Sequence, residues 1–273
     1  TINFMGIRNI AFAFTMLLTA LALFSCFHKG LNYGLDFTGG TLIELTYEKP
    51  ADVAKVRDEL VKAGYHEAVV QSFGNGMFAQ AHGFCRDRDG NFWAGDSGPF
   101  SDNPAAASKS FVFHKYSPEG KLLMTIGKGG VSKATPETFI MPTACASMPN
   151  GNIMIADGHI PRPSYAQQDG DRLVEITRDG KFVKQYGKQG TAPGEFWGPH
   201  ALAYDSQGRL FVADRSNNRI QVFDQNMNFL DDWRHFSRPS GVWILKDDTM
   251  FVADSESRYE GFTPEEFLPR QKG

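Results

Sequence analysis

Two histidines occupy the same position in a repeated fourteen-residue spacing, and paired imidazoles are typical of metal sites. Four segments begin at a small or imidazole side chain and end at an aspartate: His82 to Asp96, Thr143 to Asp157, His200 to Asp214 and Ser240 to Asp254. A lone histidine is more often a hydrogen-bonded structural residue. Its return in alternate repeats predicts that His82 and His200 face one shared axis, where a metal ion or a ligand binds.

Each of these segments reads as a strand, a tight turn and a second strand. Turn dipeptides recur, as at Asp89-Gly90 and Asn150-Gly151, and each of the first three repeats offers two further strands. The fourth repeat shows only VWILK and TMFVAD. This pattern predicts a mainly β chain that forms three to four blades of a β-propeller, with a sandwich as the main structural rival. We expect the four closing aspartates to cap turns through backbone hydrogen bonds.

A run without charge extends over residues 10–27, IAFAFTMLLTALALFSCF. As a helix it would span about 27 Å, close to the thickness of a bilayer core. It predicts one retained transmembrane helix; the alternatives are a signal peptide and a buried soluble helix. Arg8 lies before the run and Lys29 after it, so the flanking charges barely decide orientation.

A short amphipathic helix is predicted after this run. Val53, Val56, Leu60 and Val61 follow helical spacing, Asp52 stands in the first turn and Gly64 ends the pattern. An extended segment follows at residues 66–73. Together with the strand-like residues before the helix, this order predicts half of a small α+β module.

The chain has three cysteines, and Cys26 falls in the apolar run. In the shared register, Cys85 and Cys145 take positions that project to opposite faces of their strands. We therefore expect two small buried residues there and no disulfide between them.

Residues 2–73 resemble the start of the translocase subunit SecF. The resemblance rests on FMGIRNIAFAF and on LDFTGGT, which supplies Asp36, Phe37, Gly39, Gly40 and Thr41 in family order directly after the apolar run. It implies a first membrane helix, part of a periplasmic domain, and Sec translocase subunits as partners. The later membrane helices of that family, with their charged residues, have no counterpart here, so this chain alone is not expected to couple proton flow to export.

Residues 76–258 resemble NHL-repeat propellers, most closely at ADRSNNRIQVF (213–223), and more narrowly the peptidyl-α-hydroxyglycine α-amidating lyase. That resemblance implies a zinc ion held by three histidines, of which His82 and His200 match two; calcium is the alternative cation. The third would come from a blade after Ser240 and is absent. A tyrosine of the family falls where this chain has His159, followed by an insertion with Tyr165, and these two are the catalytic candidates. The propeller is therefore expected to be either a zinc-dependent lyase or a ligand-binding domain.

The expected organisation is a transmembrane helix at 1–29, a SecF-like α+β segment at 30–74, propeller blades at 75–258 and a tail at 259–273. A net charge of -3 without a Lys/Arg run argues against nucleic acid as a partner. We expect the bacterial inner membrane, a cytoplasmic N-terminus, and a periplasmic propeller that takes a peptide or small molecule at its axis.

A competing hypothesis is an artificial join of two gene fragments. The module before Gly74 stops halfway, the propeller lacks its first and last blades, and the chain starts at Thr1 without a methionine.

Overall fold

The computed structural model describes residues 16, 52–66, 70, 72–74, 76–98, 108–159 and 170–254. It divides into two compact units, Thr1–Leu45 and Thr46–Gly273, and the fold below belongs to the second. The predicted transmembrane helix, the motif at Asp36 to Thr41, Tyr165 and the tail lie outside the described residues. In the described part of the chain, no helix is both long and apolar enough to cross a bilayer.

The predicted short helix is present as α3 (Val53–Lys62). Asp52 caps it, because its Oδ1 accepts hydrogen bonds from the backbone N–H groups of Ala54 at 3.0 Å and Lys55 at 3.2 Å. Gly64, at φ +94°, follows its last turn. The predicted short helix is confirmed, except that Asp52 caps the helix just before its first turn; Gly64 comes just after its end.

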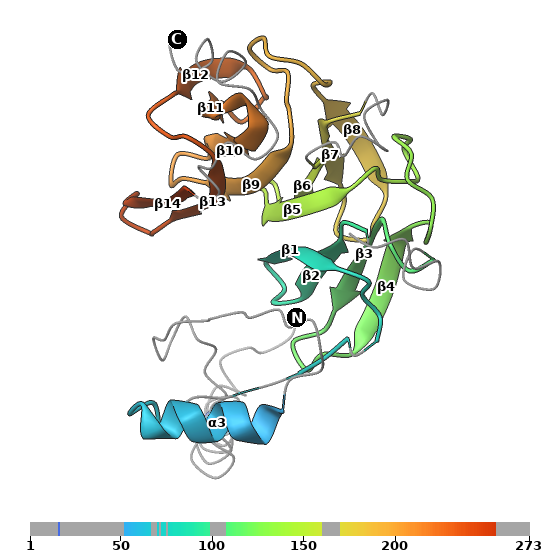
Figure 1. Ribbon diagram of the computed structural model, residues 1–273, viewed down its shortest axis with the longest axis vertical. Helices are drawn as coiled ribbons and strands as arrows, with labels where there is room; N and C mark the ends of the chain where they lie inside the picture. Colours follow the sequence, from blue (N-terminus) through green and yellow to red (C-terminus); the bar gives the residue numbers. More distant parts are fainter. Residues whose placement is uncertain are drawn as a thin grey trace, which may run out of the picture. The chain divides into compact units, whose positions relative to one another are not determined.

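The rest of the described chain is antiparallel β-structure in the predicted order. Three four-stranded sheets and a final hairpin follow one another along the chain (Figure 1). The first sheet holds β1 (Ala81–Arg86), β2 (Phe92–Asp96), β3 (Val112–Tyr116) and β4 (Leu122–Gly127); the second holds β5 (Pro142–Ser147), β6 (Ile153–Asp157), β7 (Arg172–Ile176) and β8 (Phe182–Tyr186). The third holds β9 (Pro199–Tyr204), β10 (Leu210–Asp214), β11 (Arg219–Phe223) and β12 (Phe229–Trp233), with a 3-10 turn η3 (Arg215–Asn217) before β11; the hairpin is β13 (Pro239–Ile244) and β14 (Met250–Asp254).

Neighbouring sheets pack in series through their first strands. Strand β1 contacts β5, β5 contacts β9, and β9 contacts β13. Each apolar core lies between two consecutive sheets: Trp93 packs with Ile155, Met154 with Leu210, and Phe211 with Val242. This serial stacking is propeller-like and differs from the two facing sheets of a sandwich.

The closing aspartates accept backbone hydrogen bonds, as predicted, but these bonds come mainly from the segment that enters each sheet and not from a turn between strands. Asp157 Oδ1 accepts the backbone N–H groups of Ile140 and Met141, and Asp254 accepts those of Ser237 and Arg238. Asp96 and Asp214 make the equivalent bonds at Ala79, Gln80 and Trp197. The carboxylates therefore fix where each first strand begins.

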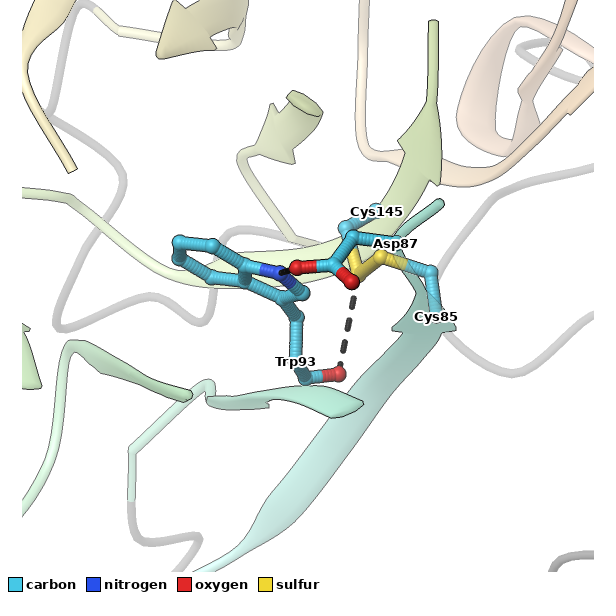
Figure 2. The surroundings of a disulfide bond; sticks show 4 residues. All are labelled: Cys85, Asp87, Trp93 and Cys145. Atoms are coloured by element: carbon cyan, nitrogen blue, oxygen red, sulfur yellow. Dashed lines mark hydrogen bonds between the residues drawn. A yellow bond between two sulfur atoms is a disulfide. The ribbon is translucent and has the colours of Figure 1, made fainter. Parts of the chain in front are cut away.

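The prediction that Cys85 and Cys145 stay unbridged is wrong. They form a disulfide between β1 and β5, with their Cα atoms 5.5 Å apart (Figure 2). Consecutive sheets stack face to face, so the forward face of one meets the backward face of the next. Side chains on opposite faces of their strands are therefore the ones that a bridge between adjacent sheets requires.

Asp171 is a buried carboxylate between two sheets. It is 4% exposed, and its Oδ2 accepts the backbone N–H of Gly198 at 2.9 Å. A Cβ built on Gly158 would lie 2.1 Å from its Oδ1, so only glycine fits beside it. Burial raises the pKa of Asp171 to about 7, and the charges of Asp214 and Asp157 add to the rise.

The ion pair of Arg219 and Asp214 gives a first prediction. Both side chains are at most 1% exposed, and Arg219 Nε lies 2.8 Å from Asp214 Oδ2. Arg219→Met strands a buried carboxylate, which should cost about 3–5 kcal/mol in the free energy of unfolding. The matched control is Arg178→Met, whose pair with Asp89 is about half exposed and should cost at most about 1 kcal/mol. Urea unfolding of the full chain in mild detergent measures both; equal losses would contradict the argument.

Asp171 gives a second prediction, on pH. The pKa of Asp171 in the folded protein lies above the ordinary value of 3.8. The stability that protonated Asp171 contributes is therefore fully present below pH 3.8 and is lost as the pH rises through about 7. Asp171→Asn keeps an acceptor for Gly198 and never ionises. The free energy of unfolding of the variant minus that of the wild type should therefore increase by about 3 kcal/mol from pH 5 to pH 8.5. Urea unfolding at the two pH values measures this gain, and a difference that does not change with pH would refute it.

Candidate metal centre

Three histidines meet at the inner strands. His82 lies on β1 and His200 on β9, while His159 follows the end of β6 by two residues. The ring centroids are 4.6 Å apart for His82 and His200, 5.2 Å for His82 and His159, and 5.4 Å for His159 and His200. The structure thus brings the two predicted metal ligands together and adds the residue predicted as a catalytic candidate.

Backbone carbonyls determine which ring nitrogen carries the proton. His82 Nδ1 lies 2.7 Å from the oxygen of Thr143, and His200 Nδ1 lies 2.8 Å from the oxygen of Ser240. Because a carbonyl oxygen can only accept, each Nδ1–H must be the donor. In the neutral rings Nε2 then keeps its lone pair, which is the arrangement that metal-binding histidines use.

These bonds repeat along the series of sheets. Thr143 and Ser240 stand at the register positions of the two histidines, so each imidazole donates to the equivalent residue of the following sheet. Thr143 continues the series, since its Oγ1 donates to the oxygen of Pro199, the residue before His200. The two histidines therefore hold consecutive sheets together as well as forming part of the cluster.

The surroundings keep the imidazoles of His82 and His200 neutral. Burial lowers the pKa of His82, with a smaller contribution from the charge of Arg215. The pKa of His200 is lowered to about 3, mainly by burial, with further electrostatic contributions from His82, Arg215 and Arg238. Neutral imidazole is the form that binds a metal, and it is present at neutral pH.

The donor set fits zinc better than calcium. One ligand atom from each histidine lies within 4.8 Å of the other two. Nitrogen donors around a tetrahedral zinc lie about 3.3 Å apart, so the rings would have to close in by up to about 1.5 Å. Calcium prefers oxygen ligands, and three imidazoles do not supply them.

Two buried arginines beside the cluster were missed from the sequence. Arg215 is 3% exposed and Arg238 is 8% exposed, and both lower the pKa of His200 through their charge. A signal was available: Arg215 directly follows the closing aspartate of the third sheet, in the stretch most similar to an NHL repeat.

Two family models match the chain in separate places. The model described as SecD/SecF GG motif matches residues 24–51, and the one described as NHL repeat matches residues 196–223. Neither covers half of the chain.

Relatives fall into the same two groups. The protein translocase subunit SecF of Pseudomonas aeruginosa is 73% identical over 75 residues, 28% of this chain and 24% of that protein. The peptidylglycine alpha-amidating monooxygenase of Rattus norvegicus is 32% identical over 184 residues, 65% of this chain and 17% of that protein. NHL repeat-containing protein 3 of Homo sapiens is 35% identical over 156 residues, 55% of this chain and 38% of that protein.

The chain therefore spans well under half the length of each of these relatives. It combines a SecF-like N-terminal segment with an NHL-repeat segment that is similar to amidating monooxygenases.

Proposed function

We propose that the propeller-like part of the chain is a zinc centre that binds a small ligand through an oxygen atom. The observation that carries this proposal is the cluster of His82, His159 and His200, in which two Nδ1–H groups are held by backbone carbonyls. A zinc ion on three imidazoles keeps an open position, where it polarises a ligand oxygen.

His159 has a specific part in this proposal. The lyase-type resemblance implies a tyrosine at this position and a third histidine from a later blade. His159 takes the place of that tyrosine and its ring packs against both other imidazoles. It serves as the third ligand, so the centre needs no later blade, and the proton-handling tyrosine is given up. A ligand-binding role is therefore favoured over lyase chemistry.

Two buried arginines near the cluster favour a negatively charged ligand. Arg215 and Arg238 lie close enough to the cluster to lower the pKa of His200. The positive charge of these two side chains favours an anionic ligand, such as the carboxylate at the end of a peptide. His82 and His200 are partly exposed, which leaves a path from solvent.

The proposed location is the outer side of a bacterial inner membrane, with the N-terminal segment as the anchor. The SecF-like segment supports the membrane, because SecF is a subunit of a protein translocase. The disulfide of Cys85 and Cys145 supports an oxidising compartment, where such bonds persist.

Zinc content tests the proposal. The full chain purified in mild detergent should carry about one zinc ion per chain by elemental mass spectrometry, as a single closed set of three imidazoles implies. His159→Ala and His200→Ala should each lose most of it, because two imidazoles bind zinc weakly. His235→Ala, at an exposed histidine, is the matched control and should keep the zinc. A wild-type chain without zinc after incubation with the ion would sink the proposal.

The same preparation separates binding from lyase chemistry. A zinc-loaded chain that releases glyoxylate from a hydroxyglycine-ended peptide is a lyase. A zinc-loaded chain that binds the peptide without release has the ligand-binding role proposed here.

A second candidate function follows from the 73% identity to SecF over 75 residues. In this reading the chain is a component of the protein-export machinery, and the propeller is an added periplasmic module. The later membrane helices of SecF are absent from the matched part, so export would depend on partner subunits.

Co-purification tests this second function. The chain should migrate with the translocase channel in mild detergent if the SecF-like segment retains its contacts, and a chain that migrates alone argues against it. A long sequencing read across the codons for residues 70–80 then decides whether one gene encodes both segments. A read that breaks there would show an artificial join.

A further inference from the structure

The disulfide and one histidine of the cluster sit on the same pair of strands. Cys85 lies three residues after His82 on β1, and Cys145 lies two residues after Thr143 on β5. The bond from His82 Nδ1 to the oxygen of Thr143, at 2.7 Å, joins the same two strands. The disulfide and the hydrogen bond that orients the His82 ring thus both connect β1 to β5.

The two strands approach closely between these ties. A Cβ built on Gly83 would lie 2.4 Å from the oxygen of Thr143 and 2.4 Å from the Cα of Ala144. Residue 83 must therefore be glycine for the backbones to come this near. Any separation of β1 from β5 lengthens the hydrogen bond of the adjacent His82.

The two cysteines differ in their exposure. Cys145 is 5% exposed and belongs to the same apolar cluster as Trp93 (Figure 2), while Cys85 is only partly buried. Cys145 Sγ lies 3.7 Å from the carbonyl oxygen of Trp93. In the reduced protein the thiol hydrogen has an acceptor there, so the second sheet keeps its packing after the bond breaks.

We propose that the Cys85–Cys145 pair is a redox control on metal binding by the three histidines. This inference rests on the proposed zinc centre. In the oxidised protein the disulfide holds β1 against β5, and His82 is oriented in advance for the metal. An external dithiol reduces it: the S–S bond breaks, two protein thiols form, and the dithiol becomes a disulfide. The freed β1 then loses the fixed orientation of His82.

The linkage is reciprocal. If reduction weakens zinc binding by a given factor, zinc makes the disulfide harder to reduce by the same factor. Loss of an outer contact to a metal-binding histidine typically costs 10-fold or more in affinity. We expect about a 10-fold weaker zinc affinity after reduction.

The experiment compares zinc affinity of the full chain in mild detergent before and after reduction, by competition with a chromophoric chelator. A phosphine reductant that does not hold zinc tightly removes the disulfide. Cys85→Ala/Cys145→Ala should bind as weakly as the reduced wild type and should not respond to the reductant. Cys26→Ala is the control and should respond as the wild type does. Circular dichroism verifies that each form stays folded.

Three results would overturn the inference. Equal zinc affinity in both redox states overturns it while leaving the zinc centre intact. Tighter binding after reduction also overturns it, because the thiolates would then act as ligands. Absence of zinc from both states removes the proposed centre, and the inference falls with it.

Discussion

A series of hydrogen bonds between the first strands of consecutive sheets is the constraint on which the rest of this structure depends. His82 donates to the oxygen of Thr143, Thr143 donates to the oxygen of Pro199, and His200 donates to the oxygen of Ser240. Each bond joins one sheet to the next and replaces water at a buried polar group. At the two histidines it also fixes the tautomer. The hydrogen bonds that hold the sheets together are thus also the ones that orient the two histidines proposed as metal ligands.

Buried charge reinforces this arrangement further out along each sheet. Asp157 and Asp214 are fully buried and each pairs with an arginine of the third strand, Arg172 or Arg219. The same carboxylates accept backbone N–H groups from the segment that enters the sheet. Neither charge would be tolerated alone. The pairs therefore demand that the entering segment, the second strand and the third strand meet in one register.

Periodicity explains what could be predicted and what could not. The register repeats, so strand order, the capping aspartates and the approach of His82 to His200 followed from spacing alone. His159 lies beyond the end of β6, outside the repeated positions, and its place depends on how the chain leaves the sheet. The disulfide could not be predicted for another reason. The spacing does place the two cysteines on opposite faces of their strands. When one sheet stacks on the next, however, these opposite faces are the ones that meet. Arg215 was missed because its importance depends on burial, which spacing does not show.

The disulfide also bears on where the two segments of this chain belong. A bond such as that between Cys85 and Cys145 is typical of oxidising surroundings, and the similarity of the N-terminal segment to SecF suggests association with an inner membrane. These two indications come from different parts of the chain and agree. A reducing cytoplasm would instead leave β1 tied to β5 by hydrogen bonds and packing alone, with His82 less firmly oriented. An oxidising compartment, which preserves the bond between β1 and β5, would thus also favour the metal centre proposed above.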